Sequence, residues 1–328
     1  MGRVTAFGSV RSCGVTTLVL GLAATWPRRA EPQGRPVLVV EADPAGGTLA
    51  ASAGWPAEPG LVSLAAAARR GAEPSLVFEH CQHLPGAASV LAGPARSDQA
   101  RSALGMLGPL LGRLGELDAD VLVDCGRLDD TSAALGVFEG ADRSVLVSRG
   151  RLADLQALSS WLDAHPAGPG TGLVVVGDGP YFDAEIAEAL GLAVLARLPW
   201  DPGTPDALVA CSASDRRLRM APLVRAARTL AEHLARDGSP IDEVVEDVVL
   251  TDQPHAGRRV AVASRVRVTV TVACVVGWER NCSLLSNAVR RICGCPQPLQ
   301  GSIWPMMRRP APHHGTNPPA KCPHREAS

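Results

Sequence analysis

The feature of this sequence that most constrains its fold is an alternation of short apolar segments with longer amphipathic ones, from residue 4 to about residue 236. Several of the short segments are apolar at every position, which is typical of strands covered on both faces of a sheet. The alternation predicts an α/β fold, namely a doubly wound, mainly parallel sheet with helices on both faces. The predicted strands are Val4–Phe7, Val37–Val40, Ser89–Ala92, Val121–Val123, Ser144–Val147, Leu173–Val176 and Ala193–Ala196.

Amphipathic periodicity predicts helices between these strands, among them Leu18–Thr25, Ala100–Leu117 and Leu152–Ala164. A last helix is predicted over Leu218–Arg236, where apolar residues recur at spacings of four, three and four. These residues are Leu223, Ala227, Leu230 and Leu234. A basic amphipathic helix can lie on an anionic membrane. We expect this one instead to pack against the sheet with its arginines in solvent, so membrane contact is not predicted.

Charge divides the chain into an acidic part and a basic one. Residues 255–328 contain 11 basic and two acidic residues, a net charge of +9, whereas residues 1–254 have a net charge of −10. We therefore expect an α/β domain over residues 1–236 and an acidic linker over residues 237–254. The rest is expected to be a basic tail that is disordered or lies outside the true reading frame. Its charge would attract DNA non-specifically.

Other cofactors and locations are disfavoured by the sequence. A zinc site is suggested by Cys293, Cys295, His313, His314, Cys322 and His324, but their spacing matches no compact zinc module. A dehydrogenase-type dinucleotide site is disfavoured because the first loop lacks Gly-x-Gly-x-x-Gly. No apolar run reaches the length of about 18 residues that a transmembrane helix requires, so a cytoplasmic protein is expected.

The loop between the first predicted strand and the following helix is typical of a phosphate-binding site. It is rich in small residues and ends in Gly14-Val15-Thr16-Thr17. In such loops, backbone N–H groups and the helix N-terminus hold phosphate oxygens, and a Ser or Thr hydroxyl coordinates Mg²⁺. The lysine that normally reaches the phosphates is missing, because the only lysine in the chain is Lys321.

Two further predicted strands end in carboxylates. Val37–Val40 is followed by Glu41 and Asp43, and Val121–Val123 is followed by Asp124. Ligands of open α/β sheets bind beyond the carboxyl ends of the strands, so we expect Asp43 and Asp124 to lie near the phosphate loop. The alternative is that each acid is a turn or helix-capping residue.

On these motifs the chain resembles the ParA/MinD family of deviant Walker-type ATPases over about residues 1–236. The resemblance implies that ATP and Mg²⁺ are bound. The residues implied to contact the nucleotide are Arg11, Ser12, Cys13, Gly14, Val15, Thr16, Thr17, Pro199 and Asp201. It also implies that Thr16 and Asp124 hold Mg²⁺, and that Asp43 is catalytic and positions the attacking water.

The chain departs from the family pattern at several positions. Val15 stands where the P-loop lysine belongs, Val10 where the signature lysine belongs, and Gly177 where the family carries an adenine-reading Asn. Loss of one charged hydrogen bond to phosphate costs about 1.5–3 kcal/mol, or roughly 10- to 150-fold in affinity. We therefore expect weak ATP binding through backbone amides and weak or absent hydrolysis. Arg11 is either a substitute cation or a solvated loop residue.

Two functional hypotheses follow from these motifs. The first is a ParA/MinD-like nucleotide-binding protein with a degenerate Walker A loop. It would act in spatial positioning or assembly, such as chromosome partitioning, division-site placement or pilus machinery. The resemblance then implies a homodimer and protein partners from such a system. The alternative is a pseudo-ATPase, an interaction scaffold that keeps the fold but binds no nucleotide.

Overall fold

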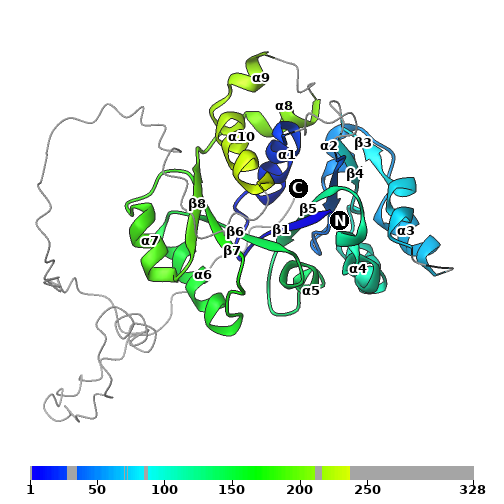
Figure 1. Cartoon of the computed structure of the whole chain (residues 1–328), viewed down its shortest axis with the longest axis horizontal. Coiled ribbons are helices and arrows are strands. Elements are labelled where there is room, and N and C mark those ends of the chain that lie inside the picture. Colours follow the sequence, from blue (N-terminus) through cyan, green and yellow to red (C-terminus); the bar gives the residue numbers. More distant parts are fainter. Residues whose placement is uncertain are drawn as a thin grey trace, which may run out of the picture. The chain divides into compact units, whose positions relative to one another are not determined.

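A single eight-stranded sheet forms the centre of the described part of the chain (Figure 1). The computed structural model describes residues 2–27, 35–69, 71, 73–84, 88–210 and 216–236, all within one unit. The strands are β1 (Arg3–Ser9), β2 (Val37–Glu41), β3 (Gln82–His83), β4 (Ala88–Leu91), β5 (Asp120–Arg127), β6 (Arg143–Arg149), β7 (Thr171–Val176) and β8 (Ala193–Leu198).

The sheet is almost entirely parallel, as predicted. The strand order is β3-β4-β2-β5-β1-β6-β7-β8, and only the pairing of β3 with β4 is antiparallel. All seven predicted strands are confirmed, and β3 is an additional two-residue edge strand that is too short to give an apolar pattern. Strands β2, β5 and β1 are neighbours, so the carboxyl ends that carry the candidate acids lie side by side with the β1–α1 loop.

Helices cover both faces of this sheet, which explains why several strands are apolar throughout. The helices are α1 (Val15–Thr25), α2 (Leu49–Ala53), α3 (Leu61–Ala68), α4 (Ser97–Leu111), α5 (Leu135–Glu139), α6 (Leu152–Ala164), α7 (Asp183–Leu190), α8 (Thr204–Ala210), α9 (Arg216–Met220) and α10 (Pro222–Ala235), with 3₁₀ helices η1 (Pro74–His80) and η2 (Leu114–Glu116). Consecutive strand residues point to opposite faces. Val121 and Val123 therefore pack in one core cluster with α3–α7, and Leu122 packs in the other with α1, α8 and α10 (Figure 1).

Two predicted helices have different bounds in the structure. The helix predicted over Ala100–Leu117 is α4, which ends at Leu111 and is followed by the separate turn η2. Gly112 is the C-cap residue of α4, and glycine is a poor helix former that favours an end of the helix at this point. The prediction of one helix over Leu218–Arg236 is wrong, because Pro222 begins a new helix, α10. Proline fits the first turn of a helix but not its interior.

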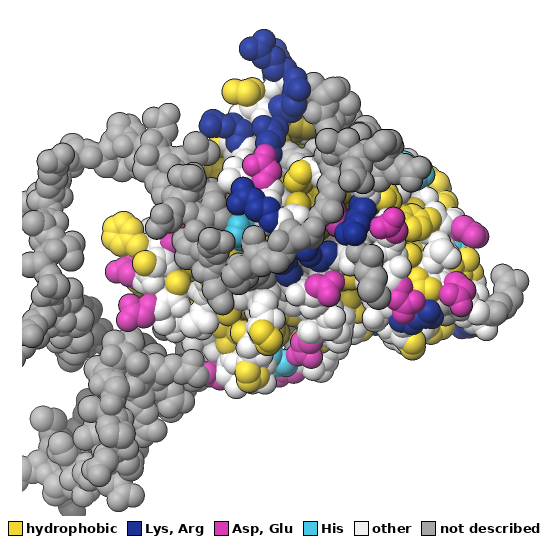
Figure 2. Space-filling view, in the orientation of Figure 1, with side chains coloured by type: hydrophobic (Ala, Val, Ile, Leu, Met, Phe, Trp, Pro, Cys, Tyr) yellow, Lys and Arg dark blue, Asp and Glu magenta, His cyan; other side chains and the backbone are white. Residues whose placement is uncertain are grey.

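The apolar stripe of α10 packs inward, as predicted. Its four residues Leu223, Ala227, Leu230 and Leu234 are at most 4% exposed, and α10 packs against α1 and β8. Figure 2 shows basic side chains gathered over α9 and α10. The sequences of these two helices contain Arg216, Arg217, Arg219, Arg225 and Arg228.

Two of the predicted segments lie outside the described residues. They are the linker over residues 237–254 and the basic tail over residues 255–328, which includes the cysteines and histidines considered for zinc. Among the helices of the described ranges, none is both long enough and apolar enough to cross a membrane.

Candidate functional site

The β1–α1 loop, residues 10–14, brings the N-terminus of α1 to the carboxyl edge of the sheet. Gly14 adopts φ +91° and ψ +36°, a left-handed conformation that favours glycine and turns the chain into the helix. Thr16 and Thr17 follow in the first turn. Within the described residues, no side chain caps α1, and its first turn contains no acidic residue. Uncapped N–H groups and the positive end of the helix dipole make such a terminus favourable for an anion.

One side chain of the loop and the first side chain of α1 belong to the core rather than to the surface. Cys13 is 2% exposed and Val15 is 5% exposed, and both pack in the cluster that contains α1. Burial raises the pKa of the Cys13 thiol, which keeps it protonated. Ser12, by contrast, is exposed. Cys13 and Val15 can therefore offer a ligand only their backbone groups.

Asp124, near the carboxyl end of the central strand β5, is completely buried. Its Oδ1 accepts a hydrogen bond of 2.9 Å from the N–H of Gly126, whereas Oδ2 has no hydrogen-bond partner among the described residues. The pKa of this carboxyl is raised to about 7, mainly by burial. A hydrogen bond with the Thr16 side chain partly offsets this rise, and the charges of Glu41 and Asp43 add to it. Buried polar atoms are almost always paired, so an unpaired carboxylate oxygen here is a candidate ligand atom for a cation.

Asp43 lies directly against Gly126. Its Oδ1 accepts a hydrogen bond of 2.7 Å from the N–H of Ala45. Gly126 has φ +59°, and a Cβ at this position would lie 2.0 Å from Cγ of Asp43. Burial raises the pKa of Asp43, and the Ala45 amide and the charge of Arg127 partly offset this rise. The structure thus brings Asp43 and Asp124 together beside the first turn of α1, as the strand ends predict.

Replacing Gly126 with alanine is expected to destabilise the protein by at least about 1–2 kcal/mol, the cost of a left-handed conformation for a residue with a Cβ. The added methyl group would also displace the Asp43 carboxyl. Urea unfolding of the full chain measures the change. Gly105→Ala is the matched control, since Gly105 lies within α4 with open space at its Cβ. That helical substitution should stabilise by about 0.5–1 kcal/mol, so equal effects of the two changes would contradict the prediction.

Glu41 holds the segment that follows β2. It lies opposite Asp124 in the register of β2 and β5 and is 2% exposed. Its Oε1 accepts hydrogen bonds from the N–H groups of Thr48 (2.6 Å) and Leu49 (3.1 Å), and its Oε2 accepts one from the N–H of Gly93 (2.9 Å). Burial raises the pKa of Glu41, and these three hydrogen bonds lower it. Glu41 is therefore a loop-organising residue, which is the alternative role considered for the acids.

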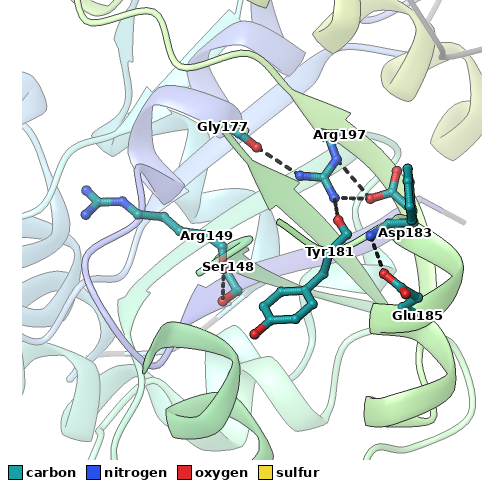
Figure 3. Close-up of polar contacts among 8 residues, drawn as sticks. Ser148, Arg149, Gly177, Tyr181, Asp183, Glu185 and Arg197 are labelled. Atoms are coloured by element: carbon teal, nitrogen blue, oxygen red, sulfur yellow. Dashed lines mark hydrogen bonds and ion pairs between the residues drawn. The ribbon is translucent and has the colours of Figure 1, made fainter. Parts of the chain in front are cut away.

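Arg197 of β8 fixes the loop that follows β7 (Figure 3). Its guanidinium donates hydrogen bonds to the carbonyl oxygens of Gly177 (3.0 Å) and Tyr181 (3.1 Å), and its Nε donates to Oδ1 of Asp183 at 2.9 Å. This loop includes Gly177, the position at which the resemblance places adenine recognition. All of these contacts are internal, so Arg197 shapes the site rather than offering a free charge.

The carboxyl end of β8 leads to the two remaining predicted contacts. Pro199 is partly buried directly after the strand. Asp201 caps α8, because its Oδ1 accepts hydrogen bonds from the N–H groups of Gly203 (3.2 Å) and Thr204 (3.3 Å). The side chain of Asp201 is thus already used by the fold.

Arg11 points along the protein surface. Its side chain is 61% exposed, and its Nε lies 4.0 Å from Oδ1 of Asp154 in α6, at the outer limit of an ion pair. Exposed pairs of this kind contribute little. Arg11 also lines a groove of about 630 Å³ together with Arg127 and Trp161, between the loop, the segment after β5, and α6. Its geometry gives no sign that it replaces the missing lysine.

Two residues near the site are not predicted from the sequence. They are Arg197, next to the end of β8, and Arg149, the last residue of β6. The available signal for both arginines was a cation within two residues of the end of a predicted apolar strand. Because strand ends line the ligand-binding edge of an α/β sheet, such a cation is a candidate for the site.

A parallel α/β sheet with this loop and these acids defines the class of P-loop NTPase-like folds. No family model matches the chain, and no curated protein matches it. Among solved structures, a ParA family ATPase from Chlorobium tepidum is 19% identical, with a TM-score of 0.58 over 71% of this chain and 98% of that one. MinD from Pyrococcus horikoshii, a septum site-determining protein in complex with Mg-ADP, is 19% identical, with a TM-score of 0.55 over 72% and 97%.

A third similar structure is a McdA–ATP complex from Cyanothece, which is 17% identical. Its TM-score is 0.51 over 71% of this chain and 96% of that one. The chain therefore has the ParA/MinD-like Walker ATPase fold.

Proposed function

We propose that this chain is a ParA/MinD-like nucleotide-binding protein with weak or absent ATP hydrolysis, acting in spatial positioning or assembly. The observation that carries the proposal is the buried, unpaired Oδ2 of Asp124, next to Thr16 and the uncapped N-terminus of α1. An apolar or fully paired interior would be the more stable solution for a scaffold that bound nothing. The name of the Pyrococcus neighbour, a septum site-determining protein, supports a positioning role.

The residues around Asp124 fit a magnesium ion. Mg²⁺ takes oxygen ligands and usually retains several waters and phosphate oxygens. The Thr16 hydroxyl and the Asp124 carboxylate are such ligands. The described residues contain no group of three or more His, Cys, Asp or Glu that could hold a metal without other ligands. When bound, Mg²⁺ would neutralise phosphate charge. The amides of Cys13, Gly14 and Val15 would hold phosphate oxygens.

Hydrolysis is expected to be weak because no lysine in the described part of the chain is placed to stabilise a developing transition state. Val15 is buried where the family has lysine, and no lysine occurs before Lys321. Stabilising that charge is most of what a phosphoryl-transfer site contributes. The Ala45 amide donates a hydrogen bond to Oδ1 of Asp43, and the carboxyl is also hydrogen-bonded to the backbone of Arg127, so the catalytic role of Asp43 stays a prediction.

Thermal unfolding of the full chain with and without millimolar ATP·Mg²⁺ tests the proposal. Binding to the folded state at 100 times Kd adds about 2.7 kcal/mol, which gives a clear rise in Tm. We expect this rise in the wild type, a loss of its Mg²⁺-dependent part in Thr16→Ala and Asp124→Ala, and no loss in the control Thr229→Ala on α10.

An unchanged wild-type Tm at these concentrations would contradict nucleotide binding. It would instead favour the second candidate function, an interaction scaffold, which the burial of Val15 in place of a phosphate-binding lysine supports. A Tm rise that Asp124→Ala retains in full would contradict the Mg²⁺ role of that acid. The homodimer, the protein partners and DNA binding by the tail stay predictions.

A further inference from the structure

Arg149 ends β6, the strand next to β1, and reaches toward the β1–α1 loop. Figure 3 shows its side chain extending away from the Arg197 contacts and toward the violet N-terminal ribbon. The backbone N–H of Arg149 donates a hydrogen bond to the sulfur of Cys13, and the positive charge of its guanidinium is close enough to lower the pKa of that thiol against the larger effect of burial. Arg149 therefore lies beside the loop that presents the N-terminus of α1.

Among the residues that the structure describes, the guanidinium of Arg149 has no anionic partner. Its Nε is buried without a hydrogen bond, and in the described part of the chain the guanidinium makes neither an ion pair nor a hydrogen bond. The guanidinium lies over the ring of Trp200, whose centroid is 4.9 Å from Cζ. A cation stacked on an aromatic face keeps its charge and its donors available in a fixed orientation. A buried N–H that remains unpaired is unfavourable, so the position suits a bound anion.

The other two arginines considered near the loop are paired internally or largely exposed. Arg197 is used by three internal acceptors, and Arg11 is exposed beside Asp154. Arg149 alone among these three combines a buried, unpaired donor with a position next to the loop.

We propose that Arg149, held against Trp200, supplies the positive charge for a phosphate group bound at the β1–α1 loop, where Val15 leaves no lysine. The inference rests on the proposed function for the identity of the ligand as a nucleotide. Its chemistry is more general, because guanidinium groups bind phosphate oxygens in two-point contacts.

Titration calorimetry of the full chain with ATP·Mg²⁺ and, separately, with pyrophosphate tests this role. Arg149→Ala should weaken both ligands about 10- to 100-fold, the usual effect of losing a charged hydrogen bond. The remaining affinity of that variant should depend less on salt than that of the wild type. Arg149→Lys should retain part of the affinity. Arg151→Ala is the matched control, an exposed arginine two residues further along, and should bind as the wild type does.

The outcomes separate this inference from the proposed function. Wild-type affinity in Arg149→Ala would overturn the role of Arg149 and leave nucleotide binding intact. Binding of pyrophosphate that depends on Arg149, without binding of ATP, would support the anion site and overturn the nucleotide assignment. Binding of neither ligand by the wild type would overturn both. If Arg149→Ala does not fold, Arg149→Gln removes the charge while keeping the packing, and unchanged pyrophosphate binding in it would overturn the inference.

Discussion

Replacing Glu41 with alanine is expected to lower the free energy of unfolding by roughly 3–5 kcal/mol, the cost of leaving two or three backbone donors unsatisfied. The carboxyl of Glu41 accepts from the N–H groups of Thr48, Leu49 and Gly93. Two of these donors, on Leu49 and Gly93, are buried, so water cannot replace the lost acceptor. Urea unfolding followed by circular dichroism measures the effect.

Two variants make this result specific to the hydrogen bonds of Glu41. Glu41→Gln keeps one carbonyl acceptor and the side-chain volume, so its loss of stability should lie between those of the wild type and the alanine variant. Glu116→Ala removes an exposed carboxylate paired with Arg113 and should leave Tm nearly unchanged. Equal stability of Glu41→Ala and Glu116→Ala would show that the contacts of Glu41 contribute nothing.

Asp124→Asn is expected to remove most of the pH dependence of stability between about pH 4 and pH 7. Burial raises the pKa of Asp124 from 3.8 to about 7, so in this window the folded protein holds a proton that the unfolded chain releases. The slope of the unfolding free energy with pH is proportional to the number of protons bound by the unfolded state minus the number bound by the native state. This difference is negative for Asp124, so its contribution to the free energy of unfolding is highest at acid pH and falls as pH rises. The difference in pKa corresponds to a fall on the order of 4 kcal/mol.

Urea unfolding at pH 4 and pH 8 measures most of this fall, which the Asn variant should largely lack. A smaller slope of the same sign should remain in Asp124→Asn, because burial also raises the pKa values of Glu41 and Asp43. Asp118→Asn, at a side chain that is 85% exposed, should keep the wild-type profile. A wild-type profile that is flat between pH 4 and pH 8 would contradict the perturbed titration of Asp124.

The sheet and the meeting of Thr16, Asp43 and Asp124 could be predicted from sequence because both depend on local pattern. Apolar runs identify strands covered on both faces, and parallel strands place their carboxyl ends at one edge. The break before Pro222 also had a local signal, but the apolar stripe that continues across it favoured a single helix.

The other parts of the site depend on contacts between residues that are distant in sequence. Glu41 receives a hydrogen bond from Gly93, 52 residues further along, and no short pattern predicts such a partner. The stacking of Arg149 on Trp200 likewise joins the ends of two different strands. A lone arginine after a strand carries no motif, so only the fold reveals its position.

The position of Asp124 in the sheet determines whether local opening or only global unfolding can displace this residue. Asp124 is paired in register with both Phe7 of β1 and Glu41 of β2, at the centre of the sheet. Central strands exchange their amide hydrogens only when the whole domain unfolds, whereas loops open with far smaller free energies. The Asp124 carboxylate should thus keep its position as long as the domain is folded. Trp200 is exposed and follows the edge strand β8, so its side chain can move when a ligand binds without unfolding of the sheet.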